Sequence, residues 1–282
     1  MKIAVMGAGA IGCYYGGLLA RSGLPVTLIG RPQHAEAVTR QGLILEIGGE
    51  RIAVPMDATT EVAGVAGADV VLFCVKSGDT EAVGRAMAPH LRPDATILCL
   101  QNGVDNPERL RAVVGCTVVP VAVYVATAMA GPGHVRHFGR GDLLMGPSTR
   151  DEEIVARFKA AGIPTTVSAN AIDALWGKLI VNCAYNALPA LTQRPYGQLL
   201  AMDGLAAVMT DVVAECVAVA KAAGIAVAPD VLASVLGLAA TMPGQRSSTA
   251  QDLAMCLQHE IDHLNGFIIR RGAALGVPTP VN

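Results

Sequence analysis

Residues 2–12 read KIAVMGAGAIG, and their pattern is the strongest indication of the fold. Lys2–Met6 predicts a short apolar strand, and a helical run follows the glycine-rich turn as far as Arg21. The turn has the spacing G-x-G-x-x-G and consists of Gly7, Ala8, Gly9, Ala10, Ile11 and Gly12. In such a unit the first glycine permits the tight turn, the second lets a pyrophosphate approach the backbone, and the third lets helix and strand pack closely. The stretch therefore predicts a Rossmann-type domain that binds a dinucleotide through residues 7–12.

The end of the next predicted strand, Pro25–Ile29, bears on the choice of dinucleotide. An enzyme that selects NAD usually places Asp or Glu there to bind the ribose 2′-hydroxyl. This chain has Gly30-Arg31 instead, and the Arg31 guanidinium is suited to a 2′-phosphate. The sequence therefore favours NADP(H) over NAD(H), the alternative being that Arg31 is an ordinary surface residue.

Two continuous apolar stretches, Asp69–Val75 and Ala95–Leu100, are typical of buried strands in a parallel sheet. Lys76 follows the first stretch and Asn102 follows the second. Ligands of such sheets bind outside the carboxyl ends of the strands, so we expect both side chains near the cofactor. Asn102 precedes Gly103, and an Asn-Gly pair is also common in turns, which is the alternative for this residue.

The remaining pattern predicts an α/β domain followed by an all-helical one. Residues 42–55 predict a β-hairpin, and residues 117–128 and 134–146 predict two further strands. Helical periodicity then replaces the strand pattern, with breaks expected near Pro189, Pro195, Pro229 and Pro243-Gly244. The predicted organisation is a dinucleotide-binding Rossmann-type domain over residues 1–168 and a helical substrate domain over residues 169–282.

Within the helical half, residues 176–186 read WGKLIVNCAYN and hold a single charged residue, Lys178. On a helix Lys178, Asn182 and Asn186 are spaced i, i+4 and i+8 and share one face. The other faces are apolar, so this helix is expected to be buried. A buried ammonium is unfavourable without a partner or a function. The segment therefore predicts either a lysine paired with a distant carboxylate or a proton donor that faces a polar ligand.

Ser248-Thr-Ala-Gln251 predicts a capping box at the start of a last long helix, which would also carry Asp252, Glu260 and Asp262. A hydroxyl at a helix N-terminus is also suited to a carboxylate ligand. Ser248 is therefore a candidate for substrate binding as well as for capping.

The same region contains HExxH at His259–His263, a pattern that on a helix can bind zinc with its glutamate as general base. The string Cys256–Gly266 also resembles the metal-binding segment of peptide deformylases. However, residues 264–282 contain no His, Cys, Asp or Glu that could supply a third ligand, and the other deformylase signatures are absent. We therefore predict no metal and expect His259 and His263 to be partly exposed helix residues.

Composition excludes several other classes. The formal net charge of the 282-residue chain is −2, which gives no basic field for nucleic acid. Glycines or prolines interrupt the uncharged runs Ile3–Ala20 and Val113–Gly133, which argues against a membrane span or a signal peptide. Seven dispersed cysteines without a CxxC pair are typical of reduced thiols. We expect a cytoplasmic protein that acts on a small molecule, with no nucleic acid or membrane partner; a homodimer is compatible with the sequence.

Taken together, the motifs resemble those of the ketopantoate reductase (2-dehydropantoate 2-reductase) family. The resemblance rests on GAGAIG at 7–12, Lys76, QNG at 101–103, WGKLIVNCAYN at 176–186, SSTAQD at 247–252 and EIDHLNGFIIRRGAALGV at 260–277. It implies an NADPH domain and a helical domain with the site in the cleft between them.

The resemblance also implies residue roles. Lys178 would be the general acid, and Glu260 would help to bind cofactor or substrate at the catalytic site. Asn102 would lie between nicotinamide and substrate. The ketoacid would be held by Asn182, Asn186 and Ser248, and NADPH by Gly7–Gly12, Arg31 and Lys76.

The expected reaction is the NADPH-dependent reduction of a 2-ketoacid, foremost of 2-dehydropantoate to pantoate. Tyr196 stands where family members often carry an asparagine that binds the distal end of the substrate, so a reductase or dehydrogenase of another 2-oxo or 2-hydroxy acid is the alternative. A non-catalytic NADP-sensing module would keep residues 7–12 but would not need Lys178, and an HExxH metallohydrolase is more remote. Family members usually continue with a further helix beyond the position of Asn282.

Overall fold

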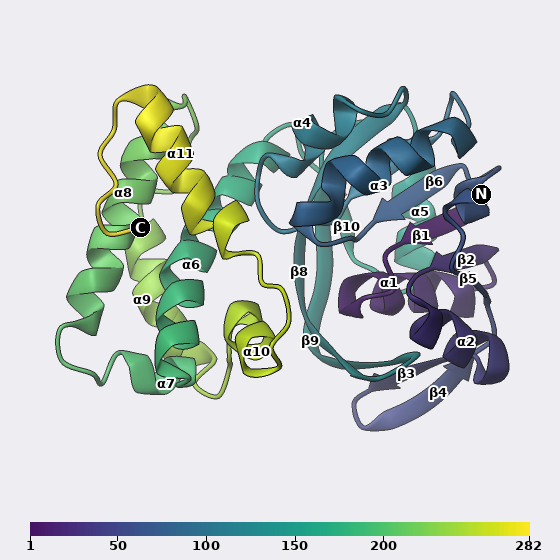
Figure 1. Ribbon diagram of the computed structural model, residues 1–282, viewed down its shortest axis with the longest axis horizontal. Coiled ribbons are helices and arrows are strands. Elements are labelled where there is room, and N and C mark those ends of the chain that lie inside the picture. Colours follow the sequence, from purple (N-terminus) through teal and green to yellow (C-terminus); the bar gives the residue numbers. More distant parts are fainter. The chain divides into compact units, whose positions relative to one another are not determined.

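The computed structural model describes residues 1–282, which divide into two compact units (Figure 1). Unit 1 comprises Met1–Gln101 and Asp105–Ile172, and unit 2 comprises Asn102–Val104 and Asp173–Asn282. The predicted class, an α/β dinucleotide-binding fold with a helical C-terminal region, is confirmed.

A ten-stranded mixed sheet forms the centre of unit 1, in the order β4-β3-β9-β8-β7-β6-β1-β2-β5, with β10 paired to β9. Its strands are β1 (Ile3–Met6), β2 (Val26–Ile29), β3 (Leu43–Ile47), β4 (Glu50–Val54), β5 (Asp57–Thr59), β6 (Val70–Phe73), β7 (Thr96–Cys99), β8 (Thr117–Gly131), β9 (His134–Met145) and β10 (Thr165–Val167). The run from β5 through β2, β1, β6 and β7 to β8 is parallel, whereas β8 with β9 and β3 with β4 are antiparallel. The predicted hairpin at 42–55 is therefore confirmed as β3–β4.

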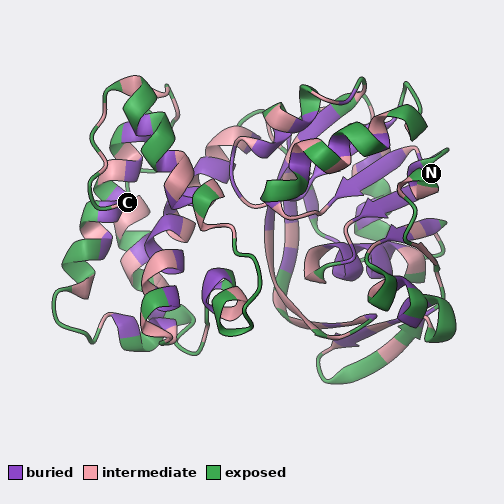
Figure 2. Cartoon of the chain, in the orientation of Figure 1, coloured by how far each residue is buried: buried purple, intermediate pink, exposed green.

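Helices cover both faces of this sheet. They are α1 (Ala10–Arg21), α2 (Pro32–Gln41), α3 (Thr80–Met87), α4 (Asn106–Arg111) and α5 (Asp151–Ala160), with short 3₁₀ turns η1 (Val62–Val65), η2 (Ser77–Asp79) and η3 (Ala88–His90). Successive side chains of a strand point to opposite faces, so Ile3 and Val5 of β1 join the core under α1 and α5, and Ala4 and Met6 join the core under α3 and α4. The central strands β1, β6 and β7 are buried throughout, whereas β4 at the edge and the outer faces of α2 and α3 are largely exposed (Figure 2).

Unit 2 is helical. Its helices are α6 (Ala171–Thr192), α7 (Tyr196–Leu199), α8 (Leu205–Ala222), α9 (Val231–Thr241), α10 (Ser248–Ala254) and α11 (Asn265–Leu275), with the 3₁₀ turn η4 (Ile261–His263) before α11. The core of this unit includes Leu179, Ile180, Cys183, Ala184 and Tyr185 of α6, each at most 1% exposed. Burial of such side chains contributes about 1.5–3 kcal/mol each for the larger apolar ones, so α6 is held mainly by packing.

Two predictions for the helical half were wrong. The chain does not break near Pro189, because α6 continues through this proline to Thr192. A proline removes only one backbone donor, and Pro189 is itself buried near the C-terminal end of the helix. The expected long helix from Ser248 also ends early, at Ala254. Leu253, Met255 and Leu257 are 45–60% exposed, so no packing extends the helix.

Candidate active site

The glycine-rich turn has a shape that depends on glycine. A Cβ on Gly12 would lie 2.1 Å from the carbonyl oxygen of Gly7, and one on Gly7, whose φ is +112°, would lie 2.8 Å from the carbonyl of Cys74. A Cβ on Gly9 meets no atom within 4 Å. Gly9 is exposed and is the N-cap of α1 without a side-chain cap, so the first N–H groups of the helix remain available to a ligand. This arrangement fits the pyrophosphate of a dinucleotide.

Arg31 lies next to this turn. The residue before it, Gly30, approaches so closely that a Cβ there would lie 2.3 Å from the Cβ of Ala8. Arg31 is exposed and forms the N-cap of α2. Burial lowers the pKa of the nearby His34, and the Arg31 charge lowers that pKa further. An exposed arginine that directly follows Gly30 has the chemistry that a 2′-phosphate requires.

Lys76 and Asn102 follow the neighbouring parallel strands β6 and β7. Lys76 is half-buried and is the N-cap residue of η2. Asn102 is also half-buried and groups with unit 2 rather than with the sheet. Gly103 next to it has a φ of +93°, which explains why glycine follows the asparagine.

The Lys178 ammonium donates a hydrogen bond to the amide oxygen of Asn102, with an Nζ–Oδ1 distance of 2.9 Å. The two residues that we selected from separate motifs are therefore in direct contact. Lys178 is half-buried rather than fully buried as we expected, because the face of α6 that carries it and Asn182 is less enclosed than the apolar faces. A partly enclosed ammonium can still reach a ligand.

Asn182 and Asn186 lie one turn apart on α6, and Asn186 is engaged within the protein. Its amide nitrogen donates to the carbonyl oxygen of Asn182 at 2.8 Å, and its amide oxygen accepts from the N–H of Thr249 at 3.4 Å. Asn186 is 3% exposed. The structure thus brings Asn186 to the start of α10, next to Ser248.

The predicted cap of α10 is shifted by one residue. The buried Ser247, and not Ser248, is the N-cap, and its hydroxyl accepts from the N–H of Ala250 at 3.2 Å. Ser248 is therefore the first helical residue, and its side chain is exposed. Since the capping role belongs to Ser247, the Ser248 hydroxyl is not committed to capping.

The HExxH segment does not lie on an α-helix. His259 and Glu260 belong to an irregular stretch after α10, and Ile261–His263 form the 3₁₀ turn η4. The i, i+4 placement of His259 and His263 on one helical face therefore does not occur, and our expectation of helix residues was wrong. The chain contains no group of three or more His, Cys, Asp or Glu side chains arranged to hold a metal. Glu260 is half-buried just before η4.

Tyr196 is a buried aromatic residue at the start of α7. Its ring centroid lies 4.4 Å from that of Tyr185 on α6, and its N–H donates to the carbonyl oxygen of Gln245. Burial raises its pKa to about 12, so the phenol is neutral at physiological pH. The hydroxyl of Tyr185 donates to the carbonyl oxygen of Val235.

The sequence analysis did not predict a set of buried polar residues that lies near the ends of β6 and β7 in unit 1. These are Ser77, Thr80, Gln101 and Asn106, together with the partly buried Arg109. A polar residue directly after an apolar strand was the available signal for Gln101, which we used only as part of the QNG motif.

No helix of the chain combines the length and the apolar character that crossing a membrane would require.

Comparison with known families gives two matches that together span most of the chain. The family described as "Ketopantoate reductase PanE/ApbA" matches residues 3–150, and "Ketopantoate reductase PanE/ApbA C terminal" matches residues 170–282. The 2-dehydropantoate 2-reductase of Pyrococcus horikoshii is 33% identical over 287 residues, covering 100% of this chain and 94% of the relative.

Two solved structures are also similar. A PanE/ApbA family ketopantoate reductase from Ralstonia eutropha has a TM-score of 0.98 and 54% identity, covering 100% of this chain and 94% of that one. A ternary complex of D-mandelate dehydrogenase with NADH and anilino(oxo)acetate has a TM-score of 0.92 and 25% identity, with the same coverage.

Proposed function

Because the chain belongs to the ketopantoate reductase family PanE/ApbA, a family of oxidoreductases, we propose that it reduces a 2-ketoacid with NADPH. The substrate that we favour is 2-dehydropantoate, which would become pantoate, since the curated relatives named 2-dehydropantoate 2-reductase match the whole chain. The observation that carries the proposal is the hydrogen bond between Lys178 and Asn102.

In this proposal residues 1–168 hold the cofactor. The uncapped start of α1 and the open space at Gly9 suit the pyrophosphate of NADPH. Arg31 would bind the 2′-phosphate, and Lys76 would add positive charge after β6. When bound, the reduced nicotinamide supplies the hydride. The seven free cysteines are consistent with a reducing compartment, and we propose the cytoplasm.

Lys178 would act as the general acid. Reduction of a ketone leaves negative charge on its oxygen, and an ammonium both stabilises this charge and supplies the proton. The Asn102 oxygen accepts a hydrogen bond from the Lys178 ammonium and so helps to fix its position. As a neutral acceptor, it does so without adding a negative charge that would strengthen the hold on the proton.

Residues 169–282 would bind the ketoacid. The Asn182 side chain and the exposed Ser248 hydroxyl offer neutral hydrogen bonds to a carboxylate, and the N-terminus of α10 adds a favourable dipole. Asn186, whose amide already bonds Asn182 and Thr249, would hold these groups in place as well as border the ligand. We assign Glu260 to cofactor or substrate binding.

A second candidate function is reduction of a different 2-ketoacid, with an apolar or aromatic side chain. It is favoured by the buried Tyr196–Tyr185 pair and by the likeness to a D-mandelate dehydrogenase. An aromatic surface recognises an apolar group better than the hydroxyl group of ketopantoate.

The test is NADPH oxidation with a panel of 2-ketoacids, using the wild type, Lys178→Ala and the surface control Lys159→Ala. Lys178→Ala should lower kcat by about 10²–10⁴-fold, the usual contribution of a general acid, while NADPH still binds. Lys159→Ala should behave as wild type. If no ketoacid gives turnover although NADPH binds, a non-catalytic sensing module replaces the reductase as the better explanation.

A further inference from the structure

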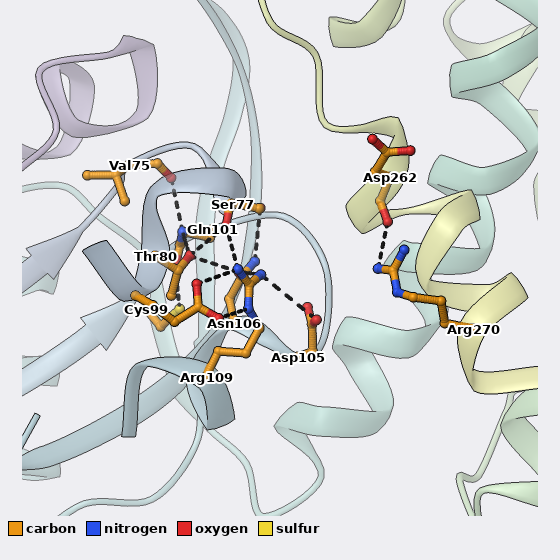
Figure 3. Close-up of polar contacts among 11 residues, drawn as sticks. Val75, Ser77, Thr80, Cys99, Gln101, Asp105, Asn106, Arg109, Asp262 and Arg270 are labelled. Carbon is orange, nitrogen blue, oxygen red and sulfur yellow. Dashed lines mark hydrogen bonds and ion pairs between the residues drawn. The ribbon is translucent and has the colours of Figure 1, made fainter. Parts of the chain in front are cut away.

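A polar cluster lies behind the carboxyl ends of β6 and β7 in unit 1 (Figure 3). We call it the strand-end cluster, and it consists of Ser77, Thr80, Gln101, Asn106 and Arg109. Polar groups this deeply enclosed lower stability unless each finds a partner, so the cluster needs an explanation.

Gln101 is the centre of this cluster. Its amide nitrogen donates to the carbonyl oxygen of Val75 at 3.1 Å and to the hydroxyl of Thr80 at 2.8 Å. Its amide oxygen accepts a hydrogen bond from the Cys99 thiol at 3.1 Å. Gln101 is 5% exposed and both ends of its amide are engaged, so its side chain serves the protein rather than a ligand.

The hydrogen bonds of Gln101 join segments that lie far apart in the sequence. Val75 directly precedes Lys76, and the backbone of residues 74–75 lies against the glycine-rich turn, since a Cβ on Gly7 would be 2.9 Å from the Val75 nitrogen. Gln101 itself directly precedes Asn102. The Gln101 side chain thus connects two parts of the chain. One is the segment that carries Lys76 and lies against the glycine-rich turn, and the other is the end of β7 just before Asn102.

Arg109 also holds the loop after β6 in place. Its guanidinium donates to the carbonyl oxygen of Ser77 and to the amide oxygen of Asn106, both at 3.0 Å. Two further hydrogen bonds, of 2.7 and 2.6 Å, reach the carboxylate of Glu81 and lower its pKa. The loop after β6 is therefore held at Val75, Ser77 and Thr80.

We propose that Gln101 is a positioning residue for the cofactor: through Val75 and Thr80 it fixes the loop that presents Lys76. This inference rests on the proposed NADPH function, in which Lys76 binds the cofactor. Gln101→Met retains the length of the side chain but removes both donors, leaving the Val75 carbonyl and the Thr80 hydroxyl without them.

Hydrogen exchange of the protein without cofactor tests the positioning directly. In Gln101→Met the amides of residues 75–80 should exchange about tenfold faster than in the wild type. Asp69→Asn is the matched control, because it weakens hydrogen bonds to Lys2 and Arg92 at the opposite end of β6. It should leave exchange at residues 75–80 unchanged. Equal exchange in Gln101→Met and wild type would overturn the proposal.

NADPH binding, followed by fluorescence titration, tests the consequence for the cofactor. The Kd should rise about tenfold in Gln101→Met, but by less than about twofold when the same change is added to Lys76→Met, because the two residues act as one unit. Independent, multiplying effects would contradict a role through Lys76.

Two further outcomes are distinguishable. If the wild type binds no NADPH, the proposed function fails and the cofactor role of Gln101 fails with it, whereas the exchange result still shows whether Gln101 fixes the loop. If Gln101→Met does not fold, Gln101→Leu replaces it, since this change also removes both donors and leaves the hydrogen bonds of Thr80 to Ser77 and Asn106 in place. The same faster exchange and weaker binding are then expected.

Discussion

The Lys178 ammonium and the Asn102 amide oxygen are 2.9 Å apart although 76 residues separate them in the sequence. One residue follows a strand of the sheet and the other lies on α6. The acceptor is a neutral amide, which orients the ammonium without supplying a counter-charge. This distinction between an amide and a carboxylate can be tested.

Asn102→Asp should lower kcat by about tenfold or more at neutral pH and change its pH dependence. A carboxylate at this distance favours the charged form of Lys178 and raises its pKa, which makes it a weaker acid. Activity that requires the protonated lysine is lost as pH rises through that pKa, so the basic limb of the kcat profile should move to higher pH. Asn102→Ala, which adds no charge, is the control and should not move the limb upward. An unshifted limb in Asn102→Asp would separate Asn102 from the proton donor.

Arg31→Ala should weaken NADPH binding by about 10–100-fold and leave NADH binding almost unchanged, since only NADPH carries the 2′-phosphate. Arg40→Ala is the matched control. Arg40 lies in the last turn of the same helix, α2, so this substitution removes the same charge from a more distant site. Kd values for both cofactors provide the measurement. Equal weakening of NADPH and NADH would remove Arg31 from the phosphate site.

The sequence predicted those parts of the fold that depend on local pattern. Two local patterns predict a parallel sheet with a dinucleotide-binding turn. They are the glycine spacing at 7–12 and the apolar runs of β6 and β7. The end of α10 could not be predicted, because it depends on whether Leu253 and Met255 find a packing surface, and they do not. The break expected near Pro189 was wrong for a similar reason, because tertiary packing stabilises α6 beyond this proline as far as Thr192.

The candidate site divides in the same way. Lys178 and Asn102 stood out because each is a polar residue in an apolar setting, yet their contact is a long-range feature that no local pattern encodes. The cap at Ser247 rather than Ser248 depends on a one-residue difference in backbone conformation. The role of Gln101 could not be predicted, because its partners, Val75 and Thr80, are fixed by strand pairing and not by spacing.

Two glycine substitutions should separate folding from binding. Gly12→Ala places a Cβ 2.1 Å from the Gly7 carbonyl oxygen, so we expect the protein to be destabilised by about 1–3 kcal/mol or more, as in overpacked cores. Gly9→Ala meets no protein atom within 4 Å and should retain the melting temperature, yet weaken NADPH binding about tenfold or more, because the pyrophosphate needs that space. Melting curves and cofactor titrations check both. Tight NADPH binding by Gly9→Ala would exclude the turn as the cofactor site.

Stability should fall in acid, in part through Asp69 and Glu81. A hydrogen bond from the Lys2 N–H lowers the pKa of Asp69, and hydrogen bonds from Arg109 lower that of Glu81. A lowered folded-state pKa contributes stability above the unfolded value, about 3.9 for Asp and 4.3 for Glu, and this is lost as pH falls through the folded value. The melting temperature should therefore hold above about pH 5 and decline below about pH 4. Glu81→Gln should show a smaller decline, and an identical decline would contradict the role of this carboxylate.

Tyr196 should decide which ketoacid is preferred. Its ring is buried and lies 4.4 Å, centroid to centroid, from that of Tyr185, at the position where the resemblance implies an asparagine in many family members. Tyr196→Asn should raise kcat/KM for 2-dehydropantoate relative to an apolar or aromatic 2-ketoacid by about tenfold or more, because a hydrogen-bonding group discriminates strongly for a hydroxyl. Tyr196→Phe keeps the ring and removes the hydroxyl, so it should retain the wild-type preference if the ring is responsible. Melting temperatures of both variants separate this effect from loss of packing. An unchanged substrate ratio in a folded Tyr196→Asn protein would mean that Tyr196 does not border the distal end of the substrate, and that the aromatic pair serves only the packing of α6 and α7.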